Sequence, residues 1–211
     1  MNLIIIIIKA FRFPFKLFQR GYNQFLKKYI DYIFLKFHGV ETKVGYVLLK
    51  GFPIIVKHSK ARIVIGKGTI LVSKSKYNFA GINHPVIIAA AKENAFIHIH
   101  GSFGGSGCTI VADKLIEIKE MVGIGVNSCV YDTDFHPVGW AKNSETKNAS
   151  IIIEKNVWVA ANSIILKGII IGENSVIGAG SVVTKNVNKN SIYAGNPAKF
   201  IKYLEDPKQT I

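Results

Sequence analysis

The chain contains little cysteine. Only two of its 211 residues are cysteines, Cys108 and Cys129, and their spacing fits neither a disulfide framework nor a metal site. Apolar residues make up 49% of the chain, which is enough to build a core without covalent cross-links. We therefore expect reduced, buried thiols and a cytoplasmic protein.

Acidic residues are also few. The chain has 13 Asp and Glu residues against 27 Lys and Arg residues, and its net charge of +14 favours anionic partners: a phosphorylated cofactor, nucleic acid or an anionic membrane surface. No nucleic-acid recognition motif accompanies the charge, so we expect no nucleic-acid partner. Residues 1–50 hold nine of the cations against Asp31 and Glu41, which is half of the net charge in about a quarter of the chain.

The amino-terminal apolar run is too short to cross a membrane. It extends from Leu3 to Ile8, far less than the roughly 20 residues that a transmembrane helix needs. Lys9 and Arg12 follow it, whereas a secretory signal peptide carries its cations before the apolar segment. We therefore expect neither a membrane span nor a signal peptide.

Residues 153–188 form six consecutive hexapeptides. A branched aliphatic residue opens each block and a small or β-branched residue stands at its fifth position, a period that fits neither an α-helix nor an ordinary half-buried strand. Such repeats are typical of a parallel β-helix, in which three short strands complete one coil and the leading side chains stack inside. Burial of each leading side chain contributes about 1.5–3 kcal/mol. The leading residues are Ile153, Val159, Ile165, Ile171, Ile177 and Val183.

The same period occurs earlier in the chain, with two interruptions. Hexapeptides run over residues 63–76 and return at Ile118, whereas residues 77–85 have the composition of an irregular loop and residues 137–150 are polar and unpatterned. We expect loop 137–150 to leave the coil and, because loops on rigid scaffolds carry binding residues, to lie beside the functional site. The glycine-rich residues 101–107 lack the Lys-Ser/Thr of a phosphate-binding loop and indicate close coil packing or approach of the backbone to a ligand.

Apolar residues recur at helical spacing between Leu17 and Phe37, with lysines between them and Gly39 as the stop. Two roles remain open for this predicted helix. It can cap the open first coil of the β-helix, or it can rest as a basic, aromatic helix on a membrane surface. At the other end of the chain, we expect residues 200–204 to form a short turn or helix.

Several segments together resemble the hexapeptide-repeat acyltransferases: I-G-E-N-S-V-I-G-A-G-S-V-V-T-K-N-V, then Y-A-G-N-P-A-K, with D-T-D-F-H-P and N-V-W-V-A-A upstream. The resemblance covers residues 95–203 well and the earlier chain loosely. It implies a left-handed parallel β-helix, acetyl-CoA as acyl donor and a homotrimer; ordinary crossover connections are right-handed, so the handedness rests on the resemblance. We divide the chain into a basic, aromatic helical segment (1–43), a β-helix domain (44–203) and a tail (204–211).

His136 is the predicted general base. An imidazole with an ordinary pKa of about 6.5 can take a proton from an acceptor hydroxyl near neutral pH. Asp132 and Asp134 share a face with it in an extended segment, so either carboxylate could orient the ring. The resemblance gives the matching histidine the role of general base, and we take Asp134 as its orienting partner. His84 is a further candidate for the acceptor pocket.

The resemblance also places the acyl donor along the prism, between adjacent subunits. Small side chains there let backbone groups approach the pantetheine arm, lysines meet the phosphates, and Trp158 lies beside the thioester. The other implied contacts are Ala161, Ala179, Thr184, Lys185, Lys199 and Lys202. Acetyltransferases of the galactoside and maltose type carry an acceptor-site asparagine where this chain has Gly104-Gly105-Ser106, which argues against a free small sugar as acceptor.

We predict a coenzyme A-dependent O-acetyltransferase that acts on a sugar of a bacterial surface polysaccharide or its precursor, with no resident metal. Transfer to the amine of an amino sugar is one alternative. A metal-dependent hydratase of the γ-carbonic-anhydrase type is another, with His98, His100 and a histidine of a neighbouring chain as ligands. A non-enzymatic β-helix scaffold is a third, although loop 137–150 beside His136 and the carboxyl-terminal signature argue against it. Peripheral membrane contact of the amino-terminal segment stays open on sequence grounds.

Overall fold

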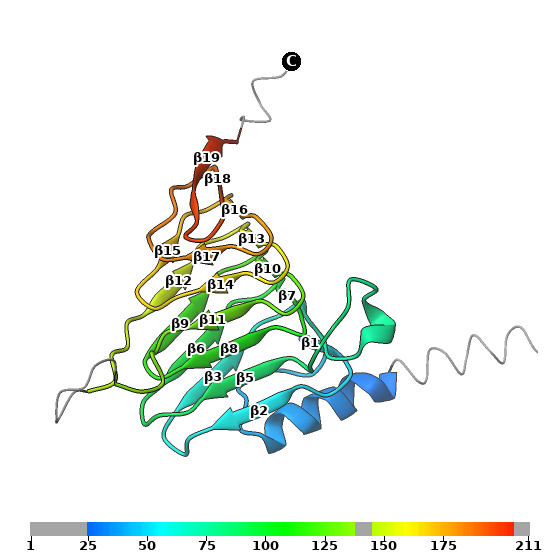
Figure 1. Ribbon diagram of the computed structural model, residues 1–211. Coiled ribbons are helices and arrows are strands. Elements are labelled where there is room, and N and C mark those ends of the chain that lie inside the picture. The colour runs from blue at the N-terminus through cyan, green and yellow to red at the C-terminus, as the bar shows by residue number, and fades with distance from the viewer. Residues whose placement is uncertain (1–24, 138–144, 205–211) are drawn as a thin grey trace, which may run out of the picture.

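The structure is a computed structural model that describes residues 25–137 and 145–204. It is a three-sided prism that narrows toward the carboxyl terminus, with a helix of residues 25–37 lying across the wide end (Figure 1). A short 3-10 helix, η1 (Ser75–Tyr77), lies in a loop outside the coil. The strands are β1 (Val47–Lys50), β2 (Ile54–Lys57), β3 (Arg62–Ile65), β4 (Thr69–Val72), β5 (Ile87–Ala90), β6 (Phe96–Ile99), β7 (Gly104–Ser106), β8 (Thr109–Ala112), β9 (Leu115–Ile118), β10 (Gly123–Ile124), β11 (Cys129–Tyr131), β12 (Ile151–Ile153), β13 (Trp158–Val159), β14 (Ile164–Ile165), β15 (Ile170–Ile171), β16 (Val176–Ile177), β17 (Val182–Val183), β18 (Ser191–Ala194) and β19 (Lys199–Tyr203).

Three sheets form the three sides, and all their strand pairs are parallel except β18 with β19. The eight-stranded sheet has the order β1-β4-β7-β10-β13-β16-β18-β19, the six-stranded sheet β17-β14-β11-β8-β5-β2, and the five-stranded sheet β15-β12-β9-β6-β3. Val159 pairs with Ile177 and Ile165 pairs with Val183, so one coil in this region takes 18 residues, or three hexapeptides. The predicted left-handed parallel β-helix is confirmed.

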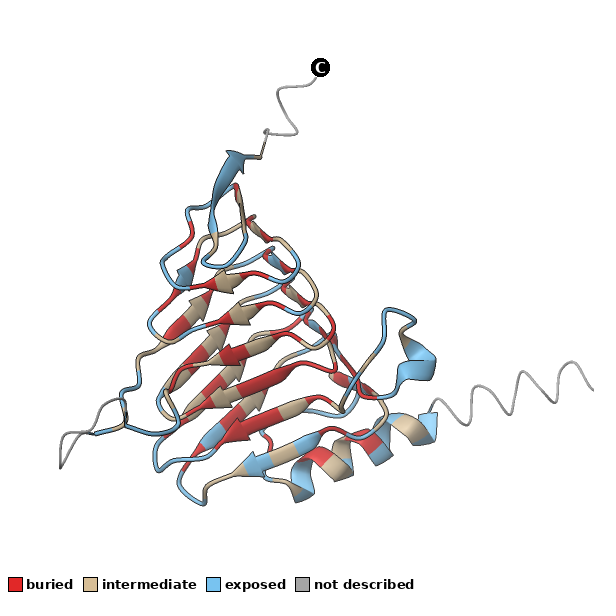
Figure 2. Cartoon of the chain, in the orientation of Figure 1, coloured by how far each residue is buried: buried red, intermediate tan, exposed pale blue. Residues whose placement is uncertain are grey.

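The core is the inside of the prism. All six leading aliphatic residues of the hexapeptides are at most 1% exposed, as predicted, and Figure 2 shows buried residues along the strands of successive coils. Small polar residues fill the corners: Ser128 and Ser163 are fully buried, and their hydroxyl groups donate to the carbonyl oxygens of Ala160 and Gly178. The buried polar groups are thereby hydrogen-bonded, as a packed interior requires.

Three asparagines occupy equivalent turns in successive coils along one edge of the narrow end. Asn156, Asn174 and Asn190 all have φ between 54° and 58°, in the left-handed region that asparagine tolerates better than most residues. Their side chains form a ladder: the amide of Asn156 donates to Asn174 over 2.9 Å, and that of Asn174 donates to Asn190 over 2.8 Å. The turns of successive coils are thus held in register.

The helix of residues 25–37 closes the wide end. Leu35 is fully buried against the core, and the buried carboxylate of Asp31 accepts hydrogen bonds from Lys27 and from the backbone N–H of Leu49. The helix stops at Gly39 (φ 74°), where the N–H of Val40 bonds to the carbonyl of Leu35 in a Schellman-type end. The capping role predicted for this helix is therefore present, whereas its predicted first turns, before residue 25, lie outside the described residues.

Two segments differ from expectation or refine it. Residues 199–203 form strand β19, antiparallel to β18, so the expected terminal turn or helix is wrong. Glycines 104 and 105 belong to strand β7 of the coil. A Cβ atom at Gly105 would lie 2.8 Å from the Cys108 sulfur, so close packing requires glycine at that position, whereas a Cβ atom at Gly104 would meet no atom within 4 Å. Cys108 is buried, Cys129 is half-buried, and both are free thiols.

Candidate active site

Asp132 anchors the segment that carries His136. This carboxylate is fully buried at the end of β11 and accepts three backbone N–H groups, from Asp113, Lys114 and Leu115, at 2.7 to 2.9 Å. Burial raises the pKa of the Asp132 carboxyl above its ordinary value, and the three N–H donors oppose that rise. Because both oxygens are occupied by backbone groups, Asp132 holds the chain in place and does not orient the imidazole.

The next three residues turn the chain out of the coil. Thr133 pairs with Asn148 in an antiparallel bridge and donates its hydroxyl to Asp113, so the two ends of loop 137–150 are held together at its base. Phe135 has φ 62°, a left-handed conformation that is unusual for a bulky side chain and that clusters at functional sites. The result is an exposed His136 at the root of the loop, of which residues 138–144 lie outside the described residues.

The imidazole of His136 has one defined contact. Its Nδ1 lies 3.1 Å from the carbonyl oxygen of Pro137, and because a carbonyl only accepts, Nδ1 donates and Nε2 keeps a free lone pair. The carboxylate of Asp134 instead binds the ammonium group of Lys167 at 2.5 Å. Asp134 therefore binds Lys167 and not the imidazole ring in this structure. Its predicted role in orienting the ring stays a prediction.

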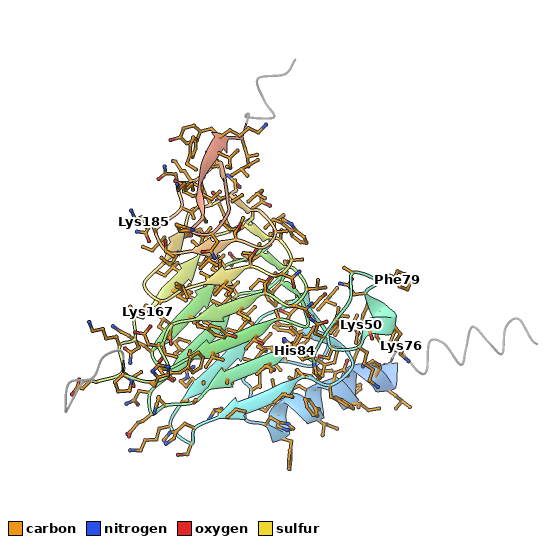
Figure 3. The ribbon with its side chains drawn as sticks, viewed as in Figure 1. Lys50, Lys76, Phe79, His84, Lys167 and Lys185 are labelled. Carbon is orange, nitrogen blue, oxygen red and sulfur yellow. The ribbon has the colours of Figure 1, made fainter. Side chains whose placement is uncertain are left out.

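A row of functional candidates follows one edge of the prism. His136, Lys167 and the pair Thr184-Lys185 come after β11, β14 and β17, which are neighbouring strands of the six-stranded sheet, so they stack coil upon coil at its carboxyl edge. Figure 3 shows Lys167 and Lys185 along the same side of the molecule. We call this the histidine edge. Lys185 suits an anionic ligand at this edge, whereas the charge of Lys167 is paired with Asp134.

The small residues occupy a different edge. Ala161 and Ala179 follow β13 and β16 of the eight-stranded sheet, and the N–H of Gly180 donates to the carbonyl of Ala161 over 2.9 Å, which places the two corners in adjacent coils. Ala179 is exposed and Ala161 half-buried. We call this the alanine edge. One chain therefore separates the predicted contacts into two edges, with the six-stranded sheet between them.

Trp158 lies on the outer face of the eight-stranded sheet. It is 53% exposed and packs over Gly123, where a Cβ atom would lie only 2.4 Å from the indole ring. Trp158 and Gly123 line an open surface pocket of about 560 Å³, with Gly104 and Met121. Glycine at position 123 is thus required by the tryptophan. Lys199 and Lys202 lie farther up this sheet, exposed on β19.

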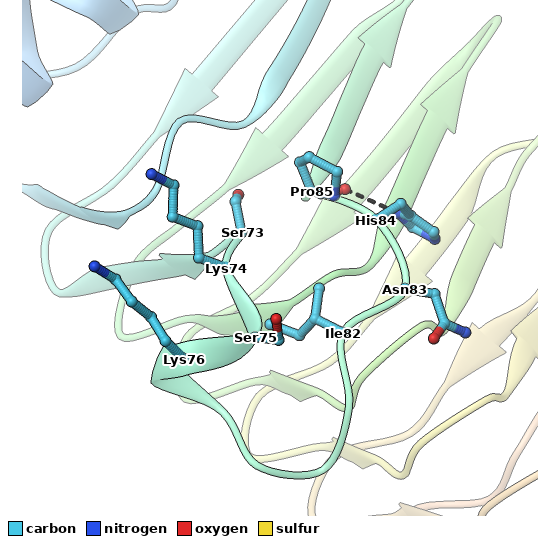
Figure 4. Close-up of a pocket in the computed structure, with 8 residues that line it drawn as sticks. All are labelled: Ser73, Lys74, Ser75, Lys76, Ile82, Asn83, His84 and Pro85. Carbon is cyan, nitrogen blue, oxygen red and sulfur yellow. Dashed lines mark hydrogen bonds between the residues drawn. The ribbon is translucent and has the colours of Figure 1, made fainter.

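Residues 74–85 form a second loop outside the coil, at the alanine edge. Its end is fixed to a corner by Asn127, which accepts the N–H of Asn83 and donates to the carbonyl of Gly81. A pocket of about 370 Å³ lies between residues 73–76 and 82–85, and Figure 4 shows Lys74 and Lys76 extending from one side of the loop and His84 from the other. The Nδ1 of His84 lies 2.8 Å from the Pro85 carbonyl, the same arrangement as in His136-Pro137.

His98, His100 and Glu117 form a cluster on the five-stranded sheet. One ligand atom of each lies within 4.8 Å of the others, so the third member beside the two histidines is a carboxylate of the same chain. Nε2 of His100 lies 2.8 Å from Glu117, whose pKa is lowered mainly by the hydrogen bond from Lys119. A divalent cation would have to displace Lys119 from that carboxylate. The cluster is on a sheet that carries none of the predicted donor contacts.

Sequence reasoning missed three functional candidates: Lys167, Gly123 and Asn127. Lys167 has the same place after its strand as the predicted Lys185 has one coil later, a repeat-based signal that was available. No such signal in the sequence marks Gly123 or Asn127, because their roles depend on which residue the next coil or a distant loop places against them.

Known proteins resemble the chain in sequence and fold. Residues 150–185 match the family model of the bacterial transferase hexapeptide (six repeats). The galactoside O-acetyltransferase of Lactococcus lactis subsp. lactis (strain IL1403) is 32% identical over 160 residues, 64% of this chain and 77% of that enzyme. The polysialic acid O-acetyltransferase of Escherichia coli O1:K1 / APEC is 44% identical over 108 residues, 46% of this chain and 33% of that enzyme, so the chain spans a minor part of it.

An N-acyltransferase from Bacillus cereus, solved with dTDP-4-amino-4,6-dideoxyglucose and coenzyme A, shares the fold. Its TM-score is 0.58 at 21% identity, over 83% of this chain and 90% of that one. The galactoside O-acetyltransferase match confirms the predicted enzyme class and, with it, the acyl donor, whereas the Bacillus cereus enzyme shows the fold alone. The chain belongs to the hexapeptide-repeat acyltransferases, the acetyl-CoA-dependent enzymes built on a left-handed β-helix.

Proposed function

We propose that the protein is a cytoplasmic O-acetyltransferase that acetylates a sugar of a bacterial surface polysaccharide or its precursor, in a site shared by neighbouring copies of the chain. The observation that carries the proposal is the separation of the candidate residues. His136 with its lysines lies on the histidine edge, and the small residues expected along the acyl donor lie on the alanine edge. A second copy that brings its alanine edge to the histidine edge of the first would complete a site.

The six-stranded sheet between the two edges offers the surface for that assembly. Its outward side chains form two rows without a charged residue, and Ile54 and Val56 are more than one-third exposed. Apolar surface of this kind is typical of subunit interfaces. In the parallel register, the rows are Ile54, Ile87, Thr109, Cys129, Ile164 and Val182, and Val56, Ala89, Val111 and Tyr131.

A closed ring of three copies would use this face three times. The histidine edge and the alanine edge flank the six-stranded sheet of each prism. Around a three-fold axis, the histidine edge of one copy can meet the alanine edge of one neighbour, and its alanine edge can meet the histidine edge of the other. Three equivalent sites would result, each with His136 from one copy and Ala161, Ala179 and the loop of His84 from the next. We therefore propose the homotrimer as the active form.

The chemistry assigns His136 the role of general base. Its Nδ1 donates to Pro137, so Nε2 can accept the proton of the acceptor hydroxyl as the oxygen attacks the thioester carbonyl. The carbon–sulfur bond then breaks, the acetyl group stays on the sugar oxygen, and the proton held on Nε2 passes to the departing thiolate. Lys185, Lys199 and Lys202 would bind the phosphates of the donor, and Trp158, Ala161, Ala179 and Thr184 would line the pantetheine arm.

The acceptor that we propose is a glycan. The galactoside O-acetyltransferase and the polysialic acid O-acetyltransferase both act on carbohydrate, as their names state, which supports a glycan acceptor. Gly104 and Gly105 stand where small-sugar enzymes of the family carry asparagine, and this favours a polysaccharide or its precursor. Transfer to an amine requires the same base and remains the alternative.

A calorimetric titration with acetyl-CoA, together with the molar mass in solution, tests the assembled site. We expect one donor site per chain and a mass three times that of the 23.3 kDa chain. Ile164→Glu places a charge in the uncharged face and should abolish both the trimer and donor binding. Ile170→Glu on the five-stranded sheet, an exposed position of the same residue type, should change neither. Donor binding by a monomeric Ile164→Glu protein would refute the shared site.

A further inference from the structure

The helix at the base of the prism is apolar on both sides. Its inner side packs on the core through Leu35, and a second stripe points away from the protein at helical spacing. The exposed fractions in that outer stripe range from 39% at Leu26 to 87% at Phe37. Helices at a protein surface normally carry polar residues there. The outer stripe consists of Leu26, Tyr29, Ile30, Ile33 and Phe37.

The surroundings of the outer stripe are cationic. Lys28 and Lys36 are exposed on the same helix, and residues 25–57 contain six lysines in all. The two acidic residues of that range are already neutralised: Asp31 binds Lys27, and Glu41 binds Arg62 through two hydrogen bonds of 2.8 Å. The base therefore combines an exposed apolar stripe with uncompensated positive charge.

We propose that the base of the prism docks on an anionic lipid surface, with the outer stripe inserted at the level of the headgroups and the lysines beside the phosphates. Amphipathic helices with lysine beside aromatic and aliphatic residues bind membranes in this orientation, through apolar burial plus attraction to anionic lipid. None of the helices within residues 25–137 and 145–204 could span a bilayer.

Two observations favour lipid over another occupant. A second copy of the base would bring like charges together, since both surfaces carry the same lysines. The 24 residues that precede the described helix contain the apolar run from Leu3 to Ile8 and four cations, Lys9, Arg12, Lys16 and Arg20, without an acidic residue. The composition that suits an anionic surface thus continues along the chain into the outer stripe.

Docking of this kind would hold the active site at a fixed distance from the lipid surface. This step rests on the proposed function. In the six-stranded sheet, β2, β5, β8 and β11 are neighbours, so three spacings of about 4.8 Å separate the base from the strand that precedes His136. A helix diameter of about 10 Å adds to this, which puts His136 roughly 25 Å above the lipid surface. A lipid-linked acceptor must therefore be a glycan of several sugars, not a single sugar on its carrier.

The test is flotation of the full-length protein with vesicles. Vesicles of phosphatidylcholine alone and of phosphatidylcholine with about 30% phosphatidylglycerol, at low and high salt, separate apolar from charge-dependent binding. We expect the protein to float with the anionic vesicles and to be released largely by high salt. Ile33→Glu with Phe37→Glu should reduce the bound fraction at least tenfold, and the matched control Ile170→Glu, near the narrow end, should float like the unchanged protein.

Three results would overturn the proposal. The unchanged protein could stay at the bottom of the gradient with anionic vesicles. The double variant could float as well as the unchanged protein, which would place lipid binding outside the outer stripe. The double variant could alter the molar mass in solution, which would make the base a contact between copies. Acetyl-CoA binding by the double variant, measured in parallel, separates a failure of docking from a failure of the proposed enzyme site.

Discussion

The carboxylate of Asp134 lies 2.5 Å from the ammonium group of Lys167, which follows the neighbouring strand of the same sheet. The pair ties the segment that carries His136 to the next coil of the prism. Both partners are partly buried, with side-chain exposures of 22% and 31%, so solvent screens them less than an exposed pair. We therefore expect Lys167 to position His136, the proposed general base, through Asp134.

Loss of either partner of this pair should lower activity without unfolding the protein. Asp134→Asn and Lys167→Met should each reduce kcat roughly tenfold, which corresponds to about 1.4 kcal/mol of lost positioning. Because both remove the same contact, the double variant should be no worse than the poorer single variant. Steady-state kinetics of the four proteins measure this coupling. Additive losses would show that the two residues act separately, as expected if Asp134 orients the imidazole directly.

Removal of the imidazole tests the assigned base. His136→Ala should fold normally, bind acetyl-CoA with unchanged affinity and lose roughly 10²- to 10⁴-fold in the rate of transfer. A general base makes the rate depend on the ionisation of one group, and the variant should lose this dependence. Rates across pH, with donor affinity measured by calorimetry, separate catalysis from binding. Turnover close to that of the unchanged enzyme would remove His136 from the mechanism.

A bulky residue at the alanine edge should block the donor. Ala179 is exposed at its corner, so Ala179→Trp adds volume without disturbing the core, and we expect at least a tenfold loss of acetyl-CoA affinity with the molar mass unchanged. Ala91→Trp, at an exposed alanine that follows β5 near the base, is the matched control. Equal affinity in both variants would show that the donor binds elsewhere.

Prediction from sequence succeeded where a residue's environment repeats. The leading aliphatic residues from Ile153 to Val183 are buried because every hexapeptide meets the same neighbours one coil away, so the pattern alone identifies them. The side-chain contacts of the candidate site do not repeat from coil to coil. The pairing of Asp134 with Lys167 and the packing of Trp158 on Gly123 depend on which residues one coil places over the next, 33 or more positions along the chain. Strand β19 was missed because its pairing with β18 is antiparallel and follows no repeat.

The cluster on the five-stranded sheet predicts a change of stability with pH. The hydrogen bond from Lys119 lowers the pKa of Glu117 below its ordinary value. The Glu117 carboxylate therefore stabilises the fold fully at pH values above its pKa in the unfolded chain, and this contribution is lost as the pH falls through its pKa in the folded protein. Glu117→Gln should therefore flatten the acid side of the stability profile, measured as thermal midpoint between about pH 3 and pH 6. Parallel profiles for the two proteins would contradict the contribution of Glu117.

Substitution of Asp132 should be costly, although asparagine has nearly the same shape. Oδ1 of Asp132 accepts the N–H of Asp113, and Oδ2 accepts those of Lys114 and Leu115. An asparagine at this position would have a single acceptor oxygen, so at least one buried N–H would face an amide NH₂ group. Removal of the buried charge offsets part of the loss, but each unsatisfied donor costs about 1–3 kcal/mol.

We therefore expect Asp132→Asn to lower the free energy of unfolding by about 2 kcal/mol, because one buried donor at least loses its acceptor. The surviving folded enzyme should also be slower, since the His136 segment begins at this anchor. Glu93→Gln, which removes only the exposed pair with Lys60, should change stability by less than about 1 kcal/mol. Urea unfolding of the three proteins provides the comparison. A neutral Asp132→Asn would mean that the chain before His136 is held by Thr133 and its partners instead.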